Sequence, residues 1–272
     1  EAPAKKFCDE FIISDYNKIK NIEEFANKVD VVTFEFENIP FKILEYIAKL
    51  KPVLPKPTVN QIIQNRFTEK KFISNTAGAI NELEIKMTKY ALIKEKSDIF
   101  KNENLLPGIL KTCTLGYDGK GQIVINNKDE ISKLEIDFNK EYILEKKINL
   151  KKEISIIITR FLNNDCLIYE PFENYHVDQM LNKSFIPADI TKDNFDKAQQ
   201  QARLIAENLD YIGTMCIEYF IDENNNLLVN EIAPRVHNSG HLTINAYNIS
   251  QFECHIRAIC NLEMITLKKI KN

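Results

Sequence analysis

Apolar and polar residues alternate in short blocks along this chain, a pattern typical of a protein that mixes strands with helices. The runs Phe11–Asp15 and Val29–Phe36 predict strands, and Ile19–Lys28 between them predicts a helix. The second run, VDVVTFEF, is almost continuously apolar, as in strands buried in a parallel sheet. It leads into Glu37 and Asn38, at the carboxyl end where open α/β sheets place their ligands. The start of the chain is therefore predicted to belong to a parallel α/β sheet.

Two further helices are predicted on either side of a proline-rich connector. Pro40 starts a helix that runs to Leu50. The connector that follows, KPVLPKP, marks the first domain boundary. Thr58 then caps a helix that carries Arg66 and Lys70 four positions apart on one face. The pattern alone leaves open whether these two cations form a solvated basic surface or contact an anionic ligand.

Glycine is concentrated in one segment. The chain has seven glycines, and three of them fall within Gly116–Gly121, after a strand predicted at Leu105–Thr112. Glycines let backbone N–H groups converge on a phosphate, and Lys111 and Lys120 add positive charge. The spacing matches neither a Walker loop nor a dinucleotide-binding fingerprint. A glycine-rich hairpin turn therefore stays open beside a phosphate-binding loop.

Strands and helices continue to alternate in the second half of the chain. Short β-branched and aromatic runs bounded by polar turns predict the strands, and apolar positions at helical spacing predict the helices. The expected elements are strands at Tyr142–Glu145, Glu153–Leu162 and Cys166–Tyr169, a polar loop at Glu173–His176, and helices at Phe195–Leu209 and Ser250–Cys260.

A β-hairpin is predicted where the runs Met215–Ile221 and Leu227–Val229 flank the polar turn DENNN. With the turn centred between its first two asparagines, Glu218 lies directly opposite Glu231, with Cβ atoms about 5 Å apart. Like charges so placed repel each other, and Mg²⁺, which binds through one or two carboxylates plus phosphate oxygens, would relieve the repulsion. Asn230 adds a neutral oxygen. A turn of odd length would instead shift the register and separate the two carboxylates.

A dense polar loop follows this hairpin. Such a loop at the end of a strand suits an anionic ligand better than a core. Zinc is not favoured, because a glycine interrupts the histidine spacing and the glutamate of a zinc-protease motif is absent. The polar residues of the loop are Arg235, His237, Asn238, Ser239 and His241.

Composition narrows the class of protein. The 272 residues are 44% hydrophobic with a net charge of -3, which suits a globular protein of one large or two to three small units. This charge gives no electrostatic case for nucleic acid or an anionic membrane, and no apolar run approaches the roughly 20 residues that span a bilayer. The six cysteines lack a CxxC motif and are expected to be reduced, as in a cytoplasmic protein. The chain opens at Glu1 rather than Met, so the natural start is expected to lie elsewhere.

Taken in order, the motifs resemble one family. They are FEFENIP, NRFTEKKF, LKTCTLGYDGKGQ, LEKKI with KEISIIITR, ENYH, IEYF, and NEIAPRVHNSGHLT with SQFECHIRAI. This series is similar to that of the N5-carboxyaminoimidazole ribonucleotide synthetases, which are ATP-grasp enzymes of purine biosynthesis. The resemblance implies an α/β ATP-grasp fold with a partial N-terminal parallel-sheet (pre-ATP-grasp) domain. It also implies a ligase that uses ATP and Mg²⁺ to carboxylate 5-aminoimidazole ribonucleotide with bicarbonate, through carboxyphosphate.

The resemblance also implies roles for individual residues. The implied Mg²⁺ ligands are Glu218 and Glu231. The implied ATP-binding residues are Arg66, Lys111, Gly116, Tyr117, Asp118, Gly119, Lys120, Gly121, Gln122, Glu145, Lys146, Lys147, Ile148, Glu153, His176, Asn230 and Glu231. The implied pocket for bicarbonate and the aminoimidazole comprises Glu37, Asn38, Arg235, His237, Asn238 and Ser239. The implied catalytic groups are Asp118, Arg235 and His237.

The expected domains are the remainder of an N-terminal α/β domain (1–57), a small ATP-grasp subdomain with a glycine-rich lid (58–140), a large subdomain with the metal site (141–260) and the start of a C-terminal domain (261–272). Against the family pattern, the opening strand and the small C-terminal domain are expected to lie outside this sequence, and Val236 and Leu242 replace a proline and a tryptophan. The expected partners are small molecules, not nucleic acid or membrane, with a homodimer as the family's usual state.

Two alternative functions stay open. One is an ATP-grasp module that binds nucleotide without turnover, and the other is another ATP-grasp ligase, which would respond to formate or biotin.

Overall fold

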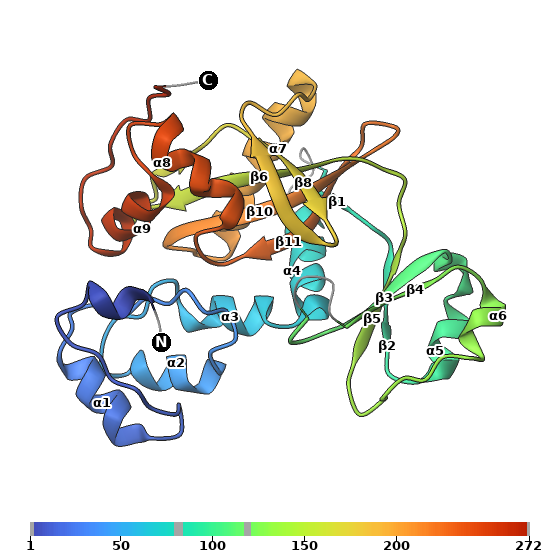
Figure 1. Cartoon of the computed structure of the whole chain (residues 1–272), viewed down its shortest axis with the longest axis horizontal. Coiled ribbons are helices and arrows are strands. Elements are labelled where there is room, and N and C mark those ends of the chain that lie inside the picture. Colours follow the sequence, from blue (N-terminus) through green and yellow to red (C-terminus); the bar gives the residue numbers. More distant parts are fainter. Residues whose placement is uncertain (1–2, 79–83, 117–120, 271–272) are drawn as a thin grey trace.

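Figure 1 shows the computed structural model of the chain, which describes residues 3–78, 84–116 and 121–270. Three parts follow one another: an N-terminal helical part, a small four-stranded sheet with its helices, and a large sheet covered by helices. Helix α4 (Arg66–Gly78) lies at the junction of these parts. This mixture of helices and sheets is the α/β class that the sequence predicts.

Helices, rather than the predicted strands, dominate the N-terminal part. They are η1 (Pro3–Lys6), α1 (Ile19–Asn27) and α2 (Phe41–Ile47). A strand needs hydrogen-bonded neighbours, and among the described residues of this part only Val32 finds one, in an isolated parallel bridge to Val53. The strands predicted at 11–15 and 29–36 are therefore wrong for the described chain. The two helices predicted here are confirmed, with shorter bounds for the second.

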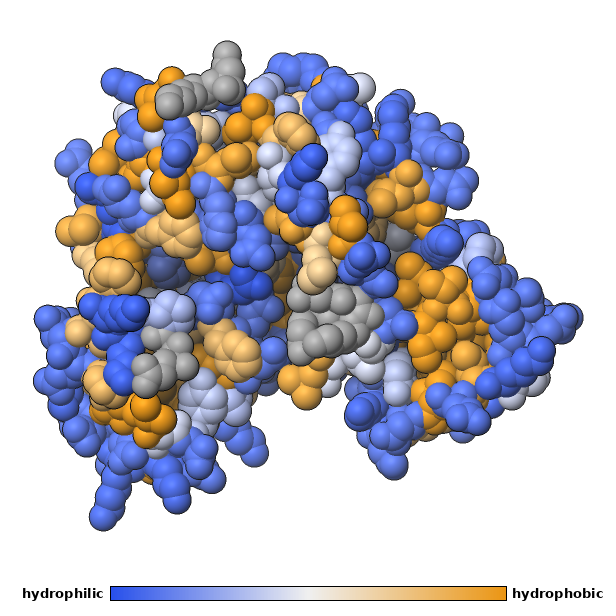
Figure 2. Space-filling model, in the orientation of Figure 1, coloured by the Kyte–Doolittle hydropathy of each residue, from blue (hydrophilic) through white to orange (hydrophobic). Residues whose placement is uncertain are grey.

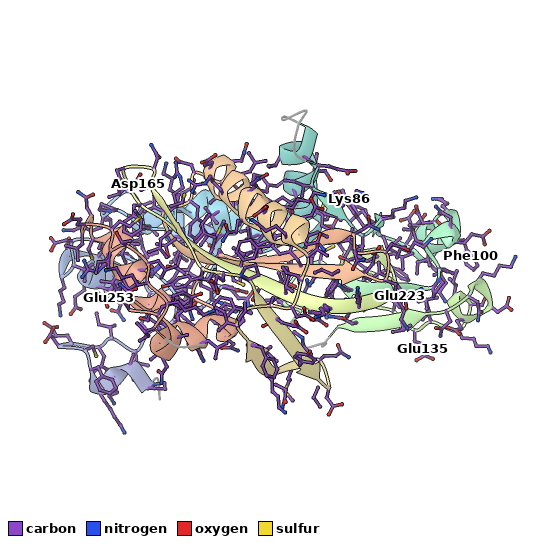
Figure 3. The ribbon with its side chains drawn as sticks, turned by 90° about the horizontal axis from the view of Figure 1, so that it is seen from above. Lys86, Phe100, Glu135, Asp165, Glu223 and Glu253 are labelled. Carbon is purple, nitrogen blue, oxygen red and sulfur yellow. The ribbon has the colours of Figure 1, made fainter. Side chains whose placement is uncertain are left out.

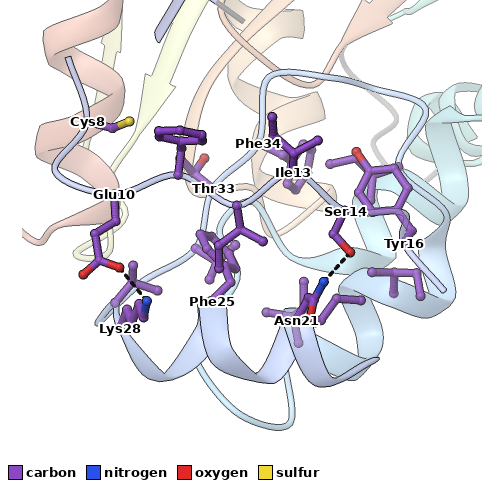
Figure 4. A pocket seen from close by; sticks show the side chains of 18 of the residues that line it. Cys8, Glu10, Ile13, Ser14, Tyr16, Asn21, Phe25, Lys28, Thr33 and Phe34 are labelled. Carbon is purple, nitrogen blue, oxygen red and sulfur yellow. Dashed lines mark hydrogen bonds and ion pairs between the residues drawn. The ribbon is translucent and has the colours of Figure 1, made fainter. Parts of the chain in front are cut away.

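A cavity of about 760 Å³ lies between residues 8–16, α1 and the segment of Thr33 and Phe34, as Figure 4 shows. Its lining is largely apolar, and Ile13 beside it is 82% exposed. Asn21 of α1 donates a hydrogen bond to Ser14 across the rim at 2.9 Å. Within the described chain, none of the predicted site residues lines this cavity.

Two helices stand where the sequence predicts one. These are α3 (Pro57–Ile63), with its proline in the first turn, and α4. Asn65 explains the break, because its side-chain oxygen accepts the backbone N–H of Phe67 at 2.9 Å and so begins a new helix. The predicted cap, Thr58, lies inside α3 instead.

The small sheet is antiparallel, with strand order β2–β5–β3–β4. Its strands are β2 (Tyr90–Ile93), β3 (Gly108–Thr112), β4 (Gln122–Ile125) and β5 (Tyr142–Lys146). The helices of this part are α5 (Lys96–Lys101), η2 (Glu103–Leu105) and α6 (Lys128–Ile131), packed around a core that includes Ile99, Leu110 and Leu144. Apolar residues also gather on the outside of this part (Figure 2). The strand predicted at 142–145 is confirmed, and the one predicted at 105–112 is confirmed from Gly108 onwards.

The large sheet has the order β1–β11–β10–β6–β8–β9, with β7 also paired to β6. Its strands are β1 (Lys86–Met87), β6 (Leu150–Arg160), β7 (Cys166–Ile168), β8 (Phe172–Val177), β9 (Met180–Phe185), β10 (Gly213–Asp222) and β11 (Leu227–Ala233). The long strands run between the turn at Asp165 and the turn at Glu223 (Figure 3).

Helices cover both faces of this sheet. The core on one face contains Ile156 and Ile158 and is completed by α7 (Lys192–Asn208), whereas Ile157 belongs to the core completed by α9 (Gln251–Ile259). A strand buried on both faces needs no polar alternation, which explains the run ISIII. The predicted long strand, its hairpin partner and both helices are confirmed. The polar loop predicted at 173–176 is wrong, because these residues belong to β8 and pair with β9.

Candidate active site

Glu218 and Glu231 lie directly opposite each other on β10 and β11, as the sequence predicts. Nearer the turn the register differs by one residue, since Tyr219 pairs with Val229. Asn230 is the extra residue of a β-bulge, which brings Glu231 back opposite Glu218. The bulge also allows the consecutive residues Asn230 and Glu231 to line the same cavity. The register shift that the sequence left open does occur, but it is corrected before the carboxylate pair.

Helix α4 holds this bulge from its outer edge. Glu69 accepts the backbone N–H of Ile232 at 2.6 Å, and Lys70 donates to the backbone carbonyl of Asn230 at 3.3 Å. Strand β1 pairs with β11 only as far as Val229, so α4 supplies partners for backbone groups beyond that point. Glu69 and Lys70 are 2% and 1% exposed, which makes this contact part of the core.

Arg66, on the same face of α4, contacts the metal-site candidate directly. Its Nη1 lies 2.8 Å from Glu231 Oε2, and its Nη2 donates to the carbonyl of Gly116 at 3.3 Å. Arg66 therefore joins the carboxylate pair to the glycine-rich segment. The interpretation of Arg66 and Lys70 as a solvated basic surface is wrong, because tertiary contacts bury both side chains.

The carboxyl of Glu69 has an unusual pKa. Burial raises the pKa, and the nearby charge of Glu231 raises it further, to about 8. Lys70 and Arg66 act in the opposite direction without cancelling the shift. Glu69 therefore holds its proton to a higher pH than an exposed carboxyl does.

Glu145 of β5 binds two lysines. Its Oε2 lies 2.8 Å from Lys111 Nζ and its Oε1 lies 3.2 Å from Lys70 Nζ. Burial alone would raise the pKa of Glu145, but the two ammonium groups outweigh it and lower the pKa to about 2. Two cations around one carboxylate leave a net positive charge, which suits a phosphate group.

Three more carboxylates each face a cationic or histidine side chain from another segment. The contacts are Glu153 Oε2 to His176 Nδ1 at 2.7 Å, Glu218 Oε1 to His237 Nε2 at 3.0 Å, and Glu37 Oε1 to Arg235 Nε at 2.7 Å. The hydrogen bond to Glu153 raises the pKa of His176. Burial raises the pKa of Glu37, although Arg235 opposes the shift.

These groups line one cavity of about 530 Å³ that both sheets help to form. It brings together side chains from α4, the two sheets, and the loops after residue 36 and after β11. The predicted site residues that line it are Glu37, Arg66, Lys111, Gly116, Gln122, Glu145, Lys146, Lys147, Ile148, Glu153, His176, Glu218, Asn230, Glu231, Arg235, His237 and Asn238.

Some predicted residues lie elsewhere. Asn38 lines an adjoining pocket of about 70 Å³, which Arg66 and Glu231 also line. Ser239 is fully buried behind the cavity. Gly121 has a φ of +75°, and a Cβ there would come within 2.8 Å of Thr112 Oγ1, so this turn requires glycine. The predicted residues that lie outside the described part of the chain are Tyr117, Asp118, Gly119 and Lys120.

Sequence reasoning also missed residues at this site. Phe220 lines the cavity two positions after Glu218, so strand alternation could have placed it there. Thr88 and Leu181 come from segments for which no strand was predicted, and no local signal marks them. Glu69 lies next to Lys70, but only the tertiary contact with β11 shows its part in the site.

The carboxylate pair suits a magnesium ion. Mg²⁺ binds through one or two carboxylates, with phosphate oxygens and water in its other positions. Glu218 and Glu231 supply such carboxylates on facing strands, and Asn230 lies beside them. In the part of the chain that the structure describes, no group of three or more His, Cys, Asp or Glu is arranged to hold a metal by itself. The residues therefore fit a cation shared with a phosphate ligand better than a closed protein site.

Comparison with known protein families defines the class. Residues 78–252 match the ATP-grasp domain, and residues 1–64 match the ribonucleotide synthetase preATP-grasp domain. The chain is therefore an ATP-grasp protein with a pre-ATP-grasp domain. The residue limits of its subdomains stay a prediction from the sequence.

Relatives identify the branch of this class. The N5-carboxyaminoimidazole ribonucleotide synthase of Staphylococcus aureus (strain MRSA252) is 38% identical over 262 residues, which are 95% of this chain and 68% of the relative. The synthase of Bacillus subtilis (strain 168) is 37% identical over 97% of this chain and 68% of its own length. This chain belongs to the N5-carboxyaminoimidazole ribonucleotide synthase family.

Solved structures agree in fold. The S. aureus enzyme complexed with ADP has a TM-score of 0.89 and 36% identity, covering 98% of this chain and 70% of that one. The Aspergillus clavatus enzyme in complex with ADP and 5-aminoimidazole ribonucleotide has a TM-score of 0.85 and 27% identity, covering 97% and 69%. The predicted ATP-grasp fold is thereby confirmed.

No helix in the described ranges combines the length and the apolar character that crossing a membrane requires.

Proposed function

We propose that this chain catalyses the ATP-dependent carboxylation of 5-aminoimidazole ribonucleotide by bicarbonate. The products are N5-carboxyaminoimidazole ribonucleotide, ADP and phosphate. Membership of the synthase family supports this reaction, as does a relative solved with ADP and 5-aminoimidazole ribonucleotide. The observation that carries the proposal is the carboxylate pair Glu218 and Glu231, which lines one cavity with Arg66, Lys111 and Arg235.

ATP is proposed to lie between the two sheets. Arg66 and Lys111 supply positive charge for the phosphates, and Gly116 and Gln122 line the same cavity. The backbone of residues 145–148 pairs with adenine, and Glu153 accepts from the ribose hydroxyls, with His176 held beside it at 2.7 Å. The net positive charge around Glu145 favours the polyphosphate over an uncharged ligand.

Glu218 and Glu231 would hold Mg²⁺, with Asn230 adjacent. When bound, the ion neutralises charge on the phosphates and orients the terminal one for transfer. Phosphates can accept from Arg66, whose planar fork carries five donors and can serve Glu231 and a phosphate together.

Bicarbonate and the ribonucleotide are proposed to meet at Glu37, Asn38, Arg235, His237 and Asn238, with Asp118 added from the glycine-rich segment. A bicarbonate oxygen attacks the γ-phosphorus and ADP leaves, which gives carboxyphosphate. The exocyclic amine then takes the carboxyl carbon and phosphate leaves, while the amine gives up a proton. Arg235 suits the anionic carboxyphosphate, because guanidinium donors match pairs of phosphate oxygens. Catalysis here is chiefly positioning and charge stabilisation.

Phosphate release tests this proposal. With Mg-ATP and bicarbonate, the chain is expected to release phosphate only when 5-aminoimidazole ribonucleotide is present. Equal ATP binding with and without the ribonucleotide, and no release in either case, would identify a nucleotide-binding module. Stimulation by formate or biotin instead would indicate another ATP-grasp ligase. Sedimentation of the same sample tests the expected homodimer.

A further inference from the structure

The imidazole of His237 is held at both of its nitrogens. Nε2 lies 3.0 Å from Glu218 Oε1 at the cavity wall, and Nδ1 lies 2.9 Å from Ser239 Oγ on the opposite side. Ser239 Oγ in turn accepts a hydrogen bond from Ser155 Oγ at 2.8 Å. A line of hydrogen bonds therefore leads from the cavity into the core.

This line continues into the β8–β9 hairpin. Asn174 Nδ2 donates to Ser155 Oγ at 3.0 Å, and Ser184 Oγ donates to Asn174 Oδ1 at 2.8 Å. With its oxygen facing Ser184, the amide of Asn174 turns its nitrogen toward Ser155. Strands β6, β8 and β9 and the 3-10 helix η3 (Asn238–Leu242) each contribute a member.

Burial makes these bonds informative. Ser155 and Ser239 are 0% exposed and Asn174 is 6% exposed. Buried polar groups cost free energy unless they are paired, and apolar residues would fill the same space without that cost. Apolar residues could not orient an imidazole, however, whereas a fully paired polar line can fix one geometry.

We propose that Ser155, Asn174 and Ser239 are positioning residues that orient the His237 imidazole toward Glu218 and the reacting groups. The part of the proposal that concerns catalysis rests on the proposed function. It gives Ser239, which the resemblance implied to be a substrate contact, a different role behind the cavity. Nδ1 also accepts the backbone N–H of Ser239 at 3.3 Å, so without the side-chain line only this longer hydrogen bond orients the ring from behind. Groups held slightly out of place cost large factors in rate.

The first test compares Ser155→Ala with the matched control Thr159→Val. Thr159 is also a fully buried hydroxyl of β6, but its partner is Thr214 Oγ1 at 2.7 Å, outside the line. In ribonucleotide-dependent phosphate release, Ser155→Ala is expected to lower kcat roughly tenfold, the scale of losses when support for a site residue is removed. The KM for ATP should change less than about twofold, because the ATP contacts remain. The control Thr159→Val should keep the wild-type kcat and KM.

Ser239→Ala removes the neighbouring hydroxyl of the same line and is expected to lower kcat as Ser155→Ala does. It replaces Ser155→Ala in the test if that variant folds poorly.

The second test asks whether the effect passes through His237. In a His237→Ala background, Ser155→Ala is expected to cause no further loss of kcat, because the group that it positions is gone. Independent, multiplying losses would overturn the proposal.

The third test does not need activity. The chain has four histidines, and ¹⁵N ring signals of the histidine-labelled full chain are assigned to His237 by their disappearance in His237→Ala. Ser155→Ala and Ser239→Ala are expected to shift the His237 signals, whereas Thr159→Val should leave them in place. If wild type releases no phosphate, the proposed function fails while these spectra still decide the positioning role. Unchanged His237 signals and unchanged kcat in both serine variants would overturn it.

Discussion

At the scale of single residues, the cavity is built from acid–base pairs. Glu231 faces Arg66, Glu218 faces His237 and Glu37 faces Arg235, each within 3.0 Å. A ligand that brings both phosphates and a cation can contact both halves of such pairs, because phosphates bind cationic side chains and the metal binds carboxylate oxygens. This charge pattern suits Mg-ATP better than either component alone.

Replacing one carboxylate tests this arrangement. Glu231→Ala is expected to lower Mg-dependent turnover by roughly 100-fold or more, because one of the two proposed metal ligands is lost. The melting temperature should change little, since the Glu231 side chain is 39% exposed. Phosphate release and thermal denaturation measure the two effects. Glu223→Ala, at the exposed tip of the same hairpin, is the control. Full turnover in Glu231→Ala would disprove the metal role.

The buried side chain of His255 predicts how the stability of the fold depends on pH. Its Nδ1 accepts the backbone N–H of Thr214 at 3.0 Å, and its Nε2 lies 2.8 Å from Thr33 Oγ1. Burial lowers the pKa of His255 to about 4, from about 6.5 in the unfolded chain. The folded state therefore binds fewer protons between these values. The contribution of His255 to stability is complete above about pH 6.5 and is lost as pH falls toward 4, by roughly 3 kcal/mol.

Urea denaturation across that range measures the effect. His255→Asn keeps an acceptor for Thr214 but does not titrate, so its free energy of unfolding should fall less steeply with acid than that of wild type. Equal slopes in the two proteins would contradict the assignment.

At the scale of elements, the sequence predicted well the helices and the hairpin whose formation depends on nearby residues. The 215–231 hairpin, α7 and α9 follow from apolar spacing, turn residues and caps such as Ser250, whose side chain accepts the N–H of Glu253. Strands that depend on distant neighbours were predicted less well. The run at 11–15 has strand character without a paired strand in the described chain, and β8 is polar because it faces the cavity and the buried hydrogen-bond line.

Helix α4 gives the prediction at this scale. Lys70→Met leaves the buried carboxylate of Glu145 with Lys111 alone and removes the donor to Asn230, so the free energy of unfolding should fall by about 3 kcal/mol. Lys71→Met, at the next and exposed position, should change it by less than about 0.5 kcal/mol. Chemical denaturation of the two variants makes the comparison. Equal stability in both would mean that α4 does not hold the bulge through Lys70.

At the scale of the whole molecule, the site exists only where three parts meet. The sequence predicted the carboxylate pair from the hairpin, and the family resemblance supplied most other cavity residues. The sequence could not predict that Glu69 and Lys70 hold the bulge, because their hydrogen bonds to β11 join residues about 160 positions apart. Nor could the sequence separate Ser239, buried behind the cavity, from the exposed Asn238 next to it, since only the packing against β6 distinguishes them.

The central claim is that Glu218 and Glu231 hold one divalent cation at the terminal phosphates of ATP. A crystal of the chain grown with Mn²⁺ in place of Mg²⁺ and a non-hydrolysable ATP analogue tests it through the anomalous signal of the metal. The account predicts a single peak within coordination distance of both carboxylates and of the terminal phosphate oxygens. A metal held by phosphates alone, beyond coordination distance of both carboxylates, would contradict it.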